Sequence, residues 1–320
     1  MCYQLKGLPA QIEICNLRMA DLIDRQAELV LVDSSSHHTE GPIYVPADNS
    51  VVWSDVKGDR VLRWHQNEVS VLRQNARFQN GNALDFSGRL VACSHGDRAV
   101  VRHHDNGEWR ILVDRYQGKR LNSPNDLVVK SDGTIWFTDP PFGLTQADQG
   151  CSGEQEQSGS FVFRYDPDTE EMSPVVIDMI RPNGLAFSPD ESVLYVSDSS
   201  AYENPQLYHH IRAYEIVDGR WATRGQTFAV IEPGEPDGLC VDAQGIVFVS
   251  AKDGVHLYAS DSSYLGKIRI PEICANVALG GKHKNRLFVT AGNSLYFIDL
   301  KVQRIKQSHW QEARQTVARL

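Results

Sequence analysis

The stretch Asn183-Gly-Leu-Ala-Phe187, followed by the turn Ser188-Pro-Asp190 and the run Leu194-Tyr-Val-Ser197, decides the fold because its pattern occurs six times in the chain. Each copy begins with a polar residue, continues with an apolar alternation, and reaches a turn rich in Gly, Asp or Ser. The copies begin at Glu40, Asn82, Asn125, Asn183, Asp237 and Asn276. Polar clusters of this kind separate β-strands, so each copy predicts a hairpin.

A third and a fourth apolar run follow each hairpin except the last, as Val61–Trp64 and Val69–Leu72 do in the first copy. Four strands in a repeat of about 40–50 residues are typical of a β-propeller blade. The sixth copy lacks its fourth strand, and a spare strand, Glu28–Val32, precedes the first copy. Pairing of that strand with the sixth blade would leave no open edge. We therefore predict an all-β fold, a six-bladed β-propeller with four-stranded antiparallel blades, closed by an N-terminal strand.

This arrangement assigns residues 28–300 to the propeller. Residues 1–27 are predicted to form a partly helical accessory segment, and residues 301–320 a polar, helix-compatible tail. The two longest repeats are explained by long loops at Pro140–Ser160 and Ser199–His210, which we expect to shape a site.

Composition and charge exclude several functional classes. The chain has 320 residues and a net charge of −9, which argues against nucleic-acid binding. No apolar run approaches the roughly 20 residues that span a bilayer, and the N-terminus does not resemble a signal peptide. Its six cysteines are scattered without zinc-site spacing, which favours free thiols in a reducing compartment. We expect a cytoplasmic protein that does not bind membranes; the oligomeric state stays open.

The first strand of each blade lines the channel of a propeller, so the residues that begin the six copies should converge at one mouth. All six carry side-chain oxygen acceptors, which suit a hard divalent cation such as calcium. Asn, Asp and Glu also end turns for structural reasons, but six coincident copies favour a cation site. The second strands are expected to end in another ring at this mouth: Asp55, His95, Asp139, Asp198 and Lys252.

Four segments in order give a family resemblance: Ser123–Gly143, which contains Trp-Phe-Thr-Asp-Pro-Pro-Phe-Gly, Arg181–Asp190, Pro236–Asp242 and Ala251–His256. The chain resembles the gluconolactonase/regucalcin (senescence marker protein, luciferin-regenerating enzyme) family from about residue 39 to residue 300. It is more similar to the bacterial gluconolactonases than to animal regucalcin. Regucalcin differs before Asn125, where a segment with a sugar-contacting arginine replaces Asn122-Ser-Pro.

The resemblance implies one divalent metal ion on the axis, held by Glu40, Asn125, Asn183 and Asp237. It also implies Asn82 and His95 as substrate-binding residues, although a histidine that ends a strand is often only a packing residue. Calcium is the expected ion, with magnesium, manganese, zinc or ferrous iron as alternatives.

Lactone hydrolysis needs a polarised carbonyl and an activated water. We predict a metal-dependent sugar lactonase, a hydrolase of carboxylic ester bonds, in which Asp237 is the catalytic base and Glu40 the second choice. The expected partner is a small lactone. Alternatives are an esterase or organophosphate hydrolase on the same scaffold, as in the related squid phosphatase, and a non-catalytic propeller that binds calcium or protein.

Overall fold

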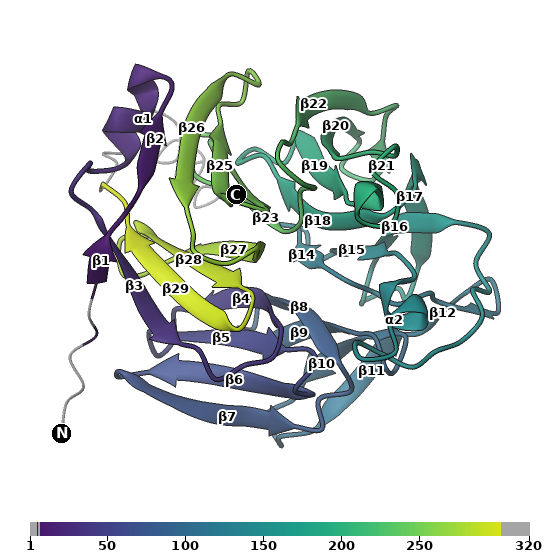
Figure 1. Cartoon of the computed structure of the whole chain (residues 1–320). Helices are drawn as coiled ribbons and strands as arrows, with labels where there is room; N and C mark the ends of the chain where they lie inside the picture. Colours follow the sequence, from purple (N-terminus) through teal and green to yellow (C-terminus); the bar gives the residue numbers. More distant parts are fainter. Residues whose placement is uncertain (1–4, 6, 302–320) are drawn as a thin grey trace, which may run out of the picture.

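A computed structural model of the chain describes residue 5 and residues 7–301. Six antiparallel sheets surround an axis (Figure 1), and a separate two-stranded sheet lies in a loop. Blade 1 consists of β4 (Thr39–Val45), β5 (Ser50–Asp55), β6 (Arg60–His65) and β7 (Glu68–Gln74). Blade 2 consists of β8 (Gln79–Leu84), β9 (Leu90–Ser94), β10 (Ala99–His103) and β11 (Trp109–Val113). Blade 3 consists of β14 (Leu127–Val129), β15 (Ile135–Asp139), β16 (Ser160–Tyr165) and β17 (Met172–Met179). Blade 4 consists of β18 (Pro182–Phe187), β19 (Val193–Asp198), β20 (His210–Val217) and β22 (Gln226–Val230). Blade 5 consists of β23 (Leu239–Val241), β24 (Val247–Ala251), β25 (Gly254–Tyr258) and β26 (Tyr264–Arg269). Blade 6 consists of β27 (Cys274–Gly280), β28 (Arg286–Ala291), β29 (Ser294–Asp299) and β3 (Glu28–Asp33). The predicted six-bladed propeller is confirmed.

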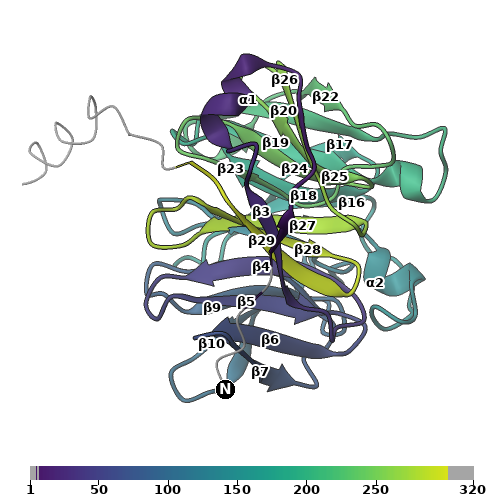
Figure 2. The ribbon, with the colours of Figure 1, turned by 60° about the vertical axis from the view of Figure 1, so that its left-hand side comes forward.

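The ring closes through β3, which pairs antiparallel with β29 and so supplies the fourth strand of blade 6, as predicted. Three blades have a fifth strand that was not predicted: β21 (Trp221–Ala222) pairs with β20 of blade 4, and the N-terminal segment supplies the other two. Strand β1 (Gly7–Pro9) pairs with β3 of blade 6, and β2 (Ile12–Ile14) pairs with β26 of blade 5. Helix α1 (Leu17–Leu22) lies beside β26, as Figure 2 shows, and buries Met19 and Leu22 there. The predicted C-terminal tail lies outside the described residues except for Lys301.

The remaining elements are short and lie between strands. They are β12 (Arg115–Tyr116), β13 (Lys119–Arg120), α2 (Phe142–Thr145) and the 3-10 helix η1 (Ser200–Tyr202). Among the described residues, no helix is long and apolar enough to cross a membrane. The five described cysteines are free thiols.

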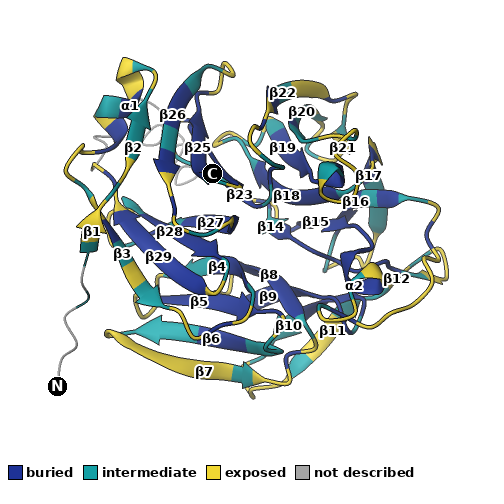
Figure 3. Cartoon of the chain, in the orientation of Figure 1, coloured by how far each residue is buried: buried dark blue, intermediate teal, exposed yellow. Residues whose placement is uncertain are grey.

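The hydrophobic core is divided into clusters between neighbouring blades. Strand β5 shows why: Val51 and Trp53 pack toward blade 6, whereas Val52 packs toward blade 2. Side chains of a strand alternate between faces, and both faces of an inner strand are covered by neighbouring blades. The inner strands are therefore almost continuously apolar and buried, while the outermost strand β7 is largely exposed (Figure 3).

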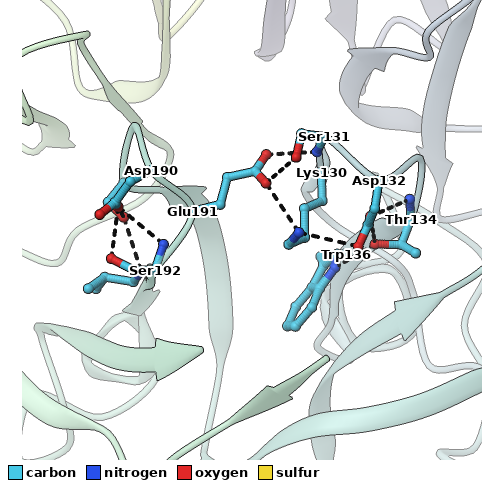
Figure 4. Close-up of polar contacts among 10 residues, drawn as sticks. Lys130, Ser131, Asp132, Thr134, Trp136, Asp190, Glu191 and Ser192 are labelled. Carbon is cyan, nitrogen blue, oxygen red and sulfur yellow. Dashed lines mark hydrogen bonds and ion pairs between the residues drawn. The ribbon is translucent and has the colours of Figure 1, made fainter. Parts of the chain in front are cut away.

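A polar clasp joins blades 3 and 4 at the far ends of their first hairpins (Figure 4). The Lys130 Nζ lies 3.2 Å from Asp132 Oδ2 and 3.1 Å from Glu191 Oε2. Ser131 donates its backbone N–H to Glu191 Oε1 at 2.7 Å and its hydroxyl to Oε2. Because Lys130 is largely buried, these contacts supply the partners that a buried ammonium requires.

Candidate functional site

A cavity of about 110 Å³ lies at the mouth where the first strands begin. Its wall consists of His38, Glu40, Asn80, Asn125, Phe142, Gln146, Gln149, Asn183, Ser199, Tyr202, Glu235 and Asp237. The wall thus brings together all four predicted metal ligands, from blades 1, 3, 4 and 5. Both long loops also contribute to it, the first through Phe142, Gln146 and Gln149, and the second through Ser199 and Tyr202.

A larger cavity of about 780 Å³ occupies the other end of the channel. It is lined mainly by the apolar residues of the first strands and by the turns that follow them, such as Asp242–Gln244. We place the candidate site in the smaller cavity because oxygen donors converge there.

Asn82 does not line the site cavity. Its Nδ2 donates to the carbonyl of Gly41 at 2.8 Å and to Ser54 Oγ at 2.9 Å, and its Oδ1 accepts from Gln79 Nε2 at 2.6 Å. The residue of blade 2 in the wall is Asn80, which the sequence analysis missed. The signal was the glycine that follows: Asn80-Gly81 matches Glu40-Gly41, Asn183-Gly184 and Asp237-Gly238.

Glycines follow the wall residues because backbone or side-chain atoms of the neighbouring blade lie directly against them. A Cβ on Gly238 would lie 2.0 Å from Asn276 Cγ, and one on Gly81 would lie 2.5 Å from Asp126 Oδ1. In blades 3 and 6 the glycine is replaced by Asp126 and by Asn276. Asn276 Nδ2 donates to Asp126 Oδ2 at 3.1 Å. Asn276 therefore forms the floor of the site. In the repeat it stands one residue after the position that the wall residues hold in the other blades.

Substitution of Gly238 by Ala tests this packing. We expect a loss of about 1–3 kcal/mol of unfolding free energy, because the new methyl group must displace Asn276 from the axis. Chemical denaturation would measure the loss. Gly153→Ala is the control, since its Cβ would meet nothing nearer than 3.6 Å. Equal stability of the two variants would contradict a crowded axis.

Hydroxyl groups on the second strands hold the wall residues of the next blade. Ser54 Oγ donates to the carbonyl of Asn80 at 2.7 Å, Thr138 Oγ1 to that of Asn183 at 2.7 Å, and Ser197 Oγ to that of Asp237 at 2.7 Å. Each of these hydroxyls is buried. The position of each wall residue is therefore set by its neighbouring blade as well as by its own strand.

The predicted second ring of ionisable groups has a structural role in this protein. Asp55 Oδ1 accepts the backbone N–H groups of His37 and His38, at 2.8 and 3.1 Å. Asp139 and Asp198 likewise accept backbone N–H groups of the segments that precede Asn125 and Asn183. None of these three aspartates, nor Lys252, belongs to the cavity wall. The three aspartates anchor the segments that lead into the wall residues.

His95 lies behind Asn125, outside the cavity wall, and is fully buried. Its Nδ1 is 2.8 Å from the carbonyl of Gln149, and its Nε2 is 3.2 Å from Asn125 Oδ1. The imidazole therefore links the first long loop to a wall residue. Its observed contact is with Asn125, and its contact with substrate stays a prediction.

Three carboxyl groups are crowded at the base of the cavity. Burial, with the neighbouring Asp126 carboxyl, raises the pKa of Glu40 to about 8. Burial raises the pKa of Asp126 to about 7. Burial and the nearby Glu40 raise the pKa of Asp237 well above its usual value. Each group disfavours ionisation of its neighbours, so a positive charge between them would be strongly stabilised.

The donor set fits a divalent cation. Asp237 Oδ1 and Asn80 Oδ1 are buried without a hydrogen-bond partner among the described residues, and buried polar atoms normally have one. Glu40, Asn125, Asn183 and Asp237 offer only oxygen donors, which favour calcium or another hard ion. The described residues hold no cluster of three His, Cys, Asp or Glu side chains arranged around one point. Amide oxygens would therefore have to complete the ligand set.

Comparison with known proteins identifies the family. The model of the SMP-30/Gluconolactonase/LRE-like region matches residues 38–293. This chain belongs to that family. The gluconolactonase of Zymomonas mobilis is 29% identical to this family member over 304 residues, which cover 89% of this chain and 84% of the relative. A pentonolactonase of Haloferax volcanii is 26% identical, covering 81% of this chain and 83% of the relative.

Solved structures extend the comparison. A gluconolactonase of Xanthomonas campestris is 39% identical to this SMP-30/gluconolactonase family member, with a TM-score of 0.88 over 94% of this chain and 98% of the other. A calcium-binding protein, regucalcin of Agrobacterium tumefaciens, is 16% identical with a TM-score of 0.69, over 85% and 94% of the two chains. At that identity the likeness concerns the fold alone.

Proposed function

We propose that this chain is a metal-dependent lactonase that hydrolyses a small sugar lactone of the gluconolactone type to its aldonic acid. Gluconolactonases and a lactonohydrolase are among the proteins similar to this chain, so the chain is a hydrolase of carboxylic ester bonds. The observation that carries the proposal is the convergence of Glu40, Asn125, Asn183 and Asp237 on one small cavity.

The wall residues have different roles in the proposed reaction. Glu40, Asn125, Asn183 and Asp237 would hold the cation, which would supply Lewis-acid polarisation of the lactone carbonyl. Asp237 has an unpartnered carboxylate oxygen in the cavity, and it is the base that takes the proton of the attacking water. The amides of Asn80, Gln146 and Gln149 line the wall where sugar hydroxyl groups need hydrogen-bond partners. Phe142 and Tyr202 add aromatic side chains to the wall.

A lactone panel with and without a chelator tests the proposal. We expect hydrolysis of gluconolactone and xylonolactone, followed by proton release with a pH indicator, and loss of at least about 90% of the rate after chelation and gel filtration. Calcium, magnesium, manganese, zinc and ferrous iron would be added back separately. Hydrolysis of paraoxon-like esters without any lactone turnover would favour the organophosphate alternative. Turnover of neither class would favour a binding protein.

Cation binding should also stabilise the folded chain, because it relieves the repulsion among Glu40, Asp126 and Asp237. We expect the midpoint of thermal unfolding to rise by several degrees when an ion that restores activity is added to the chelated protein. A midpoint that does not change with any of these ions would contradict a cation site in the cavity.

A further inference from the structure

The charges around the site cavity have one sign. Three carboxylates belong to the wall, namely Glu40, Asp237 and Glu235, and the described wall residues include no lysine or arginine. Two neighbouring basic side chains are paired with acids outside the wall, whereas Lys252, whose stem packs against Gly234, forms no ion pair among the described residues. Lys57 Nζ lies 2.7 Å from Asp148 Oδ2, and Arg181 forms an ion pair with Glu203 at 2.5 Å.

Glu40 and Asp237 are proposed cation ligands, so Glu235 is the wall carboxylate that neither binds the cation nor supports another residue. It lies on the loop between β22 and β23, and among the described residues its side chain forms no hydrogen bond or ion pair. A divalent cation held by Glu40 and Asp237 would balance those two charges and leave Glu235 uncompensated. It lies in the same cavity wall as Asp237.

Lactone hydrolysis changes the charge of the molecule in the cavity. Water adds to the carbonyl carbon, the ring C–O bond breaks, the ring oxygen becomes a hydroxyl, and the new carboxylic acid loses its proton at neutral pH. An uncharged substrate thereby becomes a product with one negative charge. A fixed negative charge in the wall distinguishes the two.

We propose that Glu235 is the anion-excluding residue of the site: it restricts the substrates to uncharged lactones and favours release of the aldonate product. This inference rests on the proposed lactonase function and adds the charge class of its substrates. Lactones that carry a phosphate or a second carboxylate are the class that Glu235 would reject. Two like charges within one small cavity repel each other strongly enough to matter, since screening by water is reduced there.

The test compares Glu235→Gln with Glu232→Gln. Glu232 lies on the same loop, but its side chain is 78% exposed and it does not belong to the site cavity. Binding of gluconate to the metal-loaded protein, measured by calorimetry without turnover, should be about tenfold tighter for Glu235→Gln and unchanged for Glu232→Gln. Glu235→Asp, which keeps the charge, should bind gluconate as the wild type does. The tenfold difference should shrink at high salt.

Kinetics provide the second readout. The ratio of kcat/KM for 6-phosphogluconolactone to that for gluconolactone should rise about tenfold in Glu235→Gln, and further in Glu235→Lys. Unchanged gluconate affinity in Glu235→Gln, or an equal change in Glu232→Gln, would overturn the inference while the lactonase proposal stands. A wild-type protein that hydrolyses no lactone would overturn both.

Discussion

The variant Asp237→Asn should hydrolyse lactones at least about a thousandfold more slowly than the wild type while remaining folded. The substitution keeps the size of the side chain and its oxygen acceptor but removes the group that can take a proton from water. It also removes one of the two carboxylates that would balance a divalent ion, so weaker cation binding should accompany the loss of rate. The backbone carbonyl of residue 237, which accepts from Ser197 Oγ at 2.7 Å, is unaffected.

Turnover of gluconolactone at saturating metal would measure the effect, with circular dichroism as the check of folding. Asp242→Asn is the matched control. Asp242 lies at the other end of the same first strand and caps a turn, where its Oδ1 accepts the backbone N–H of Ile246 at 2.8 Å. An asparagine can make the same contact, so this variant should keep its activity. Near-wild-type turnover by Asp237→Asn with metal bound would show that another group is the base.

Substitution of Val30 by Pro should cause a large loss of stability, although the residue lies outside the site. Val30 lies in the middle of β3, opposite Phe297 of β29 on one side and opposite Gly7 of β1 on the other. Proline removes a backbone donor from an interior strand and distorts the strand that closes the ring. We expect a loss of about 3 kcal/mol or more, and aggregation through the freed edge of β29.

Urea denaturation would measure the loss, and light scattering would detect the aggregation. Leu8→Pro is the control in the same sheet, because β1 is its edge strand and Leu8 is 70% exposed. That variant should lose about 1 kcal/mol or less. If both variants were equally stable, the pairing of β3 with β29 would not be what closes the ring.

The fold could be predicted from the sequence because each blade is a local unit. Runs such as Leu90–Ser94 coincide with the observed strands, since the turns that separate them have strong signals of their own. The closing strand was also predictable, because a spare strand at one end of the chain matched a missing strand at the other. The fifth strands β1 and β2 were not predicted, because three-residue pairings leave no periodicity to detect.

The candidate site was only partly predictable. The repeat predicted six oxygen-bearing residues at one mouth, and the family resemblance selected Glu40, Asn125, Asn183 and Asp237 from them; these four lie in the cavity wall. Asn82 was predicted where Asn80 lies in the wall, since a shift of two residues keeps a side chain on the same face and changes only its depth in the channel. Aligning the copies on their glycines would have found Asn80.

A ring of six blades, with oxygen-bearing side chains at one mouth, could be inferred from the repeat alone. The tertiary structure was needed to show which of the other polar residues support the backbone around the cavity and which belong to its wall. Asp55, Asp139 and Asp198 hold backbone segments, Asp126 and Asn276 fill the axis, and Glu235 enters the wall from a loop. The physical reason is that periodicity fixes which face a residue takes, whereas its partners come from neighbouring blades that are far away in the chain. The same reason explains why the −9 net charge was uninformative until the structure placed three of its carboxylates around one small cavity.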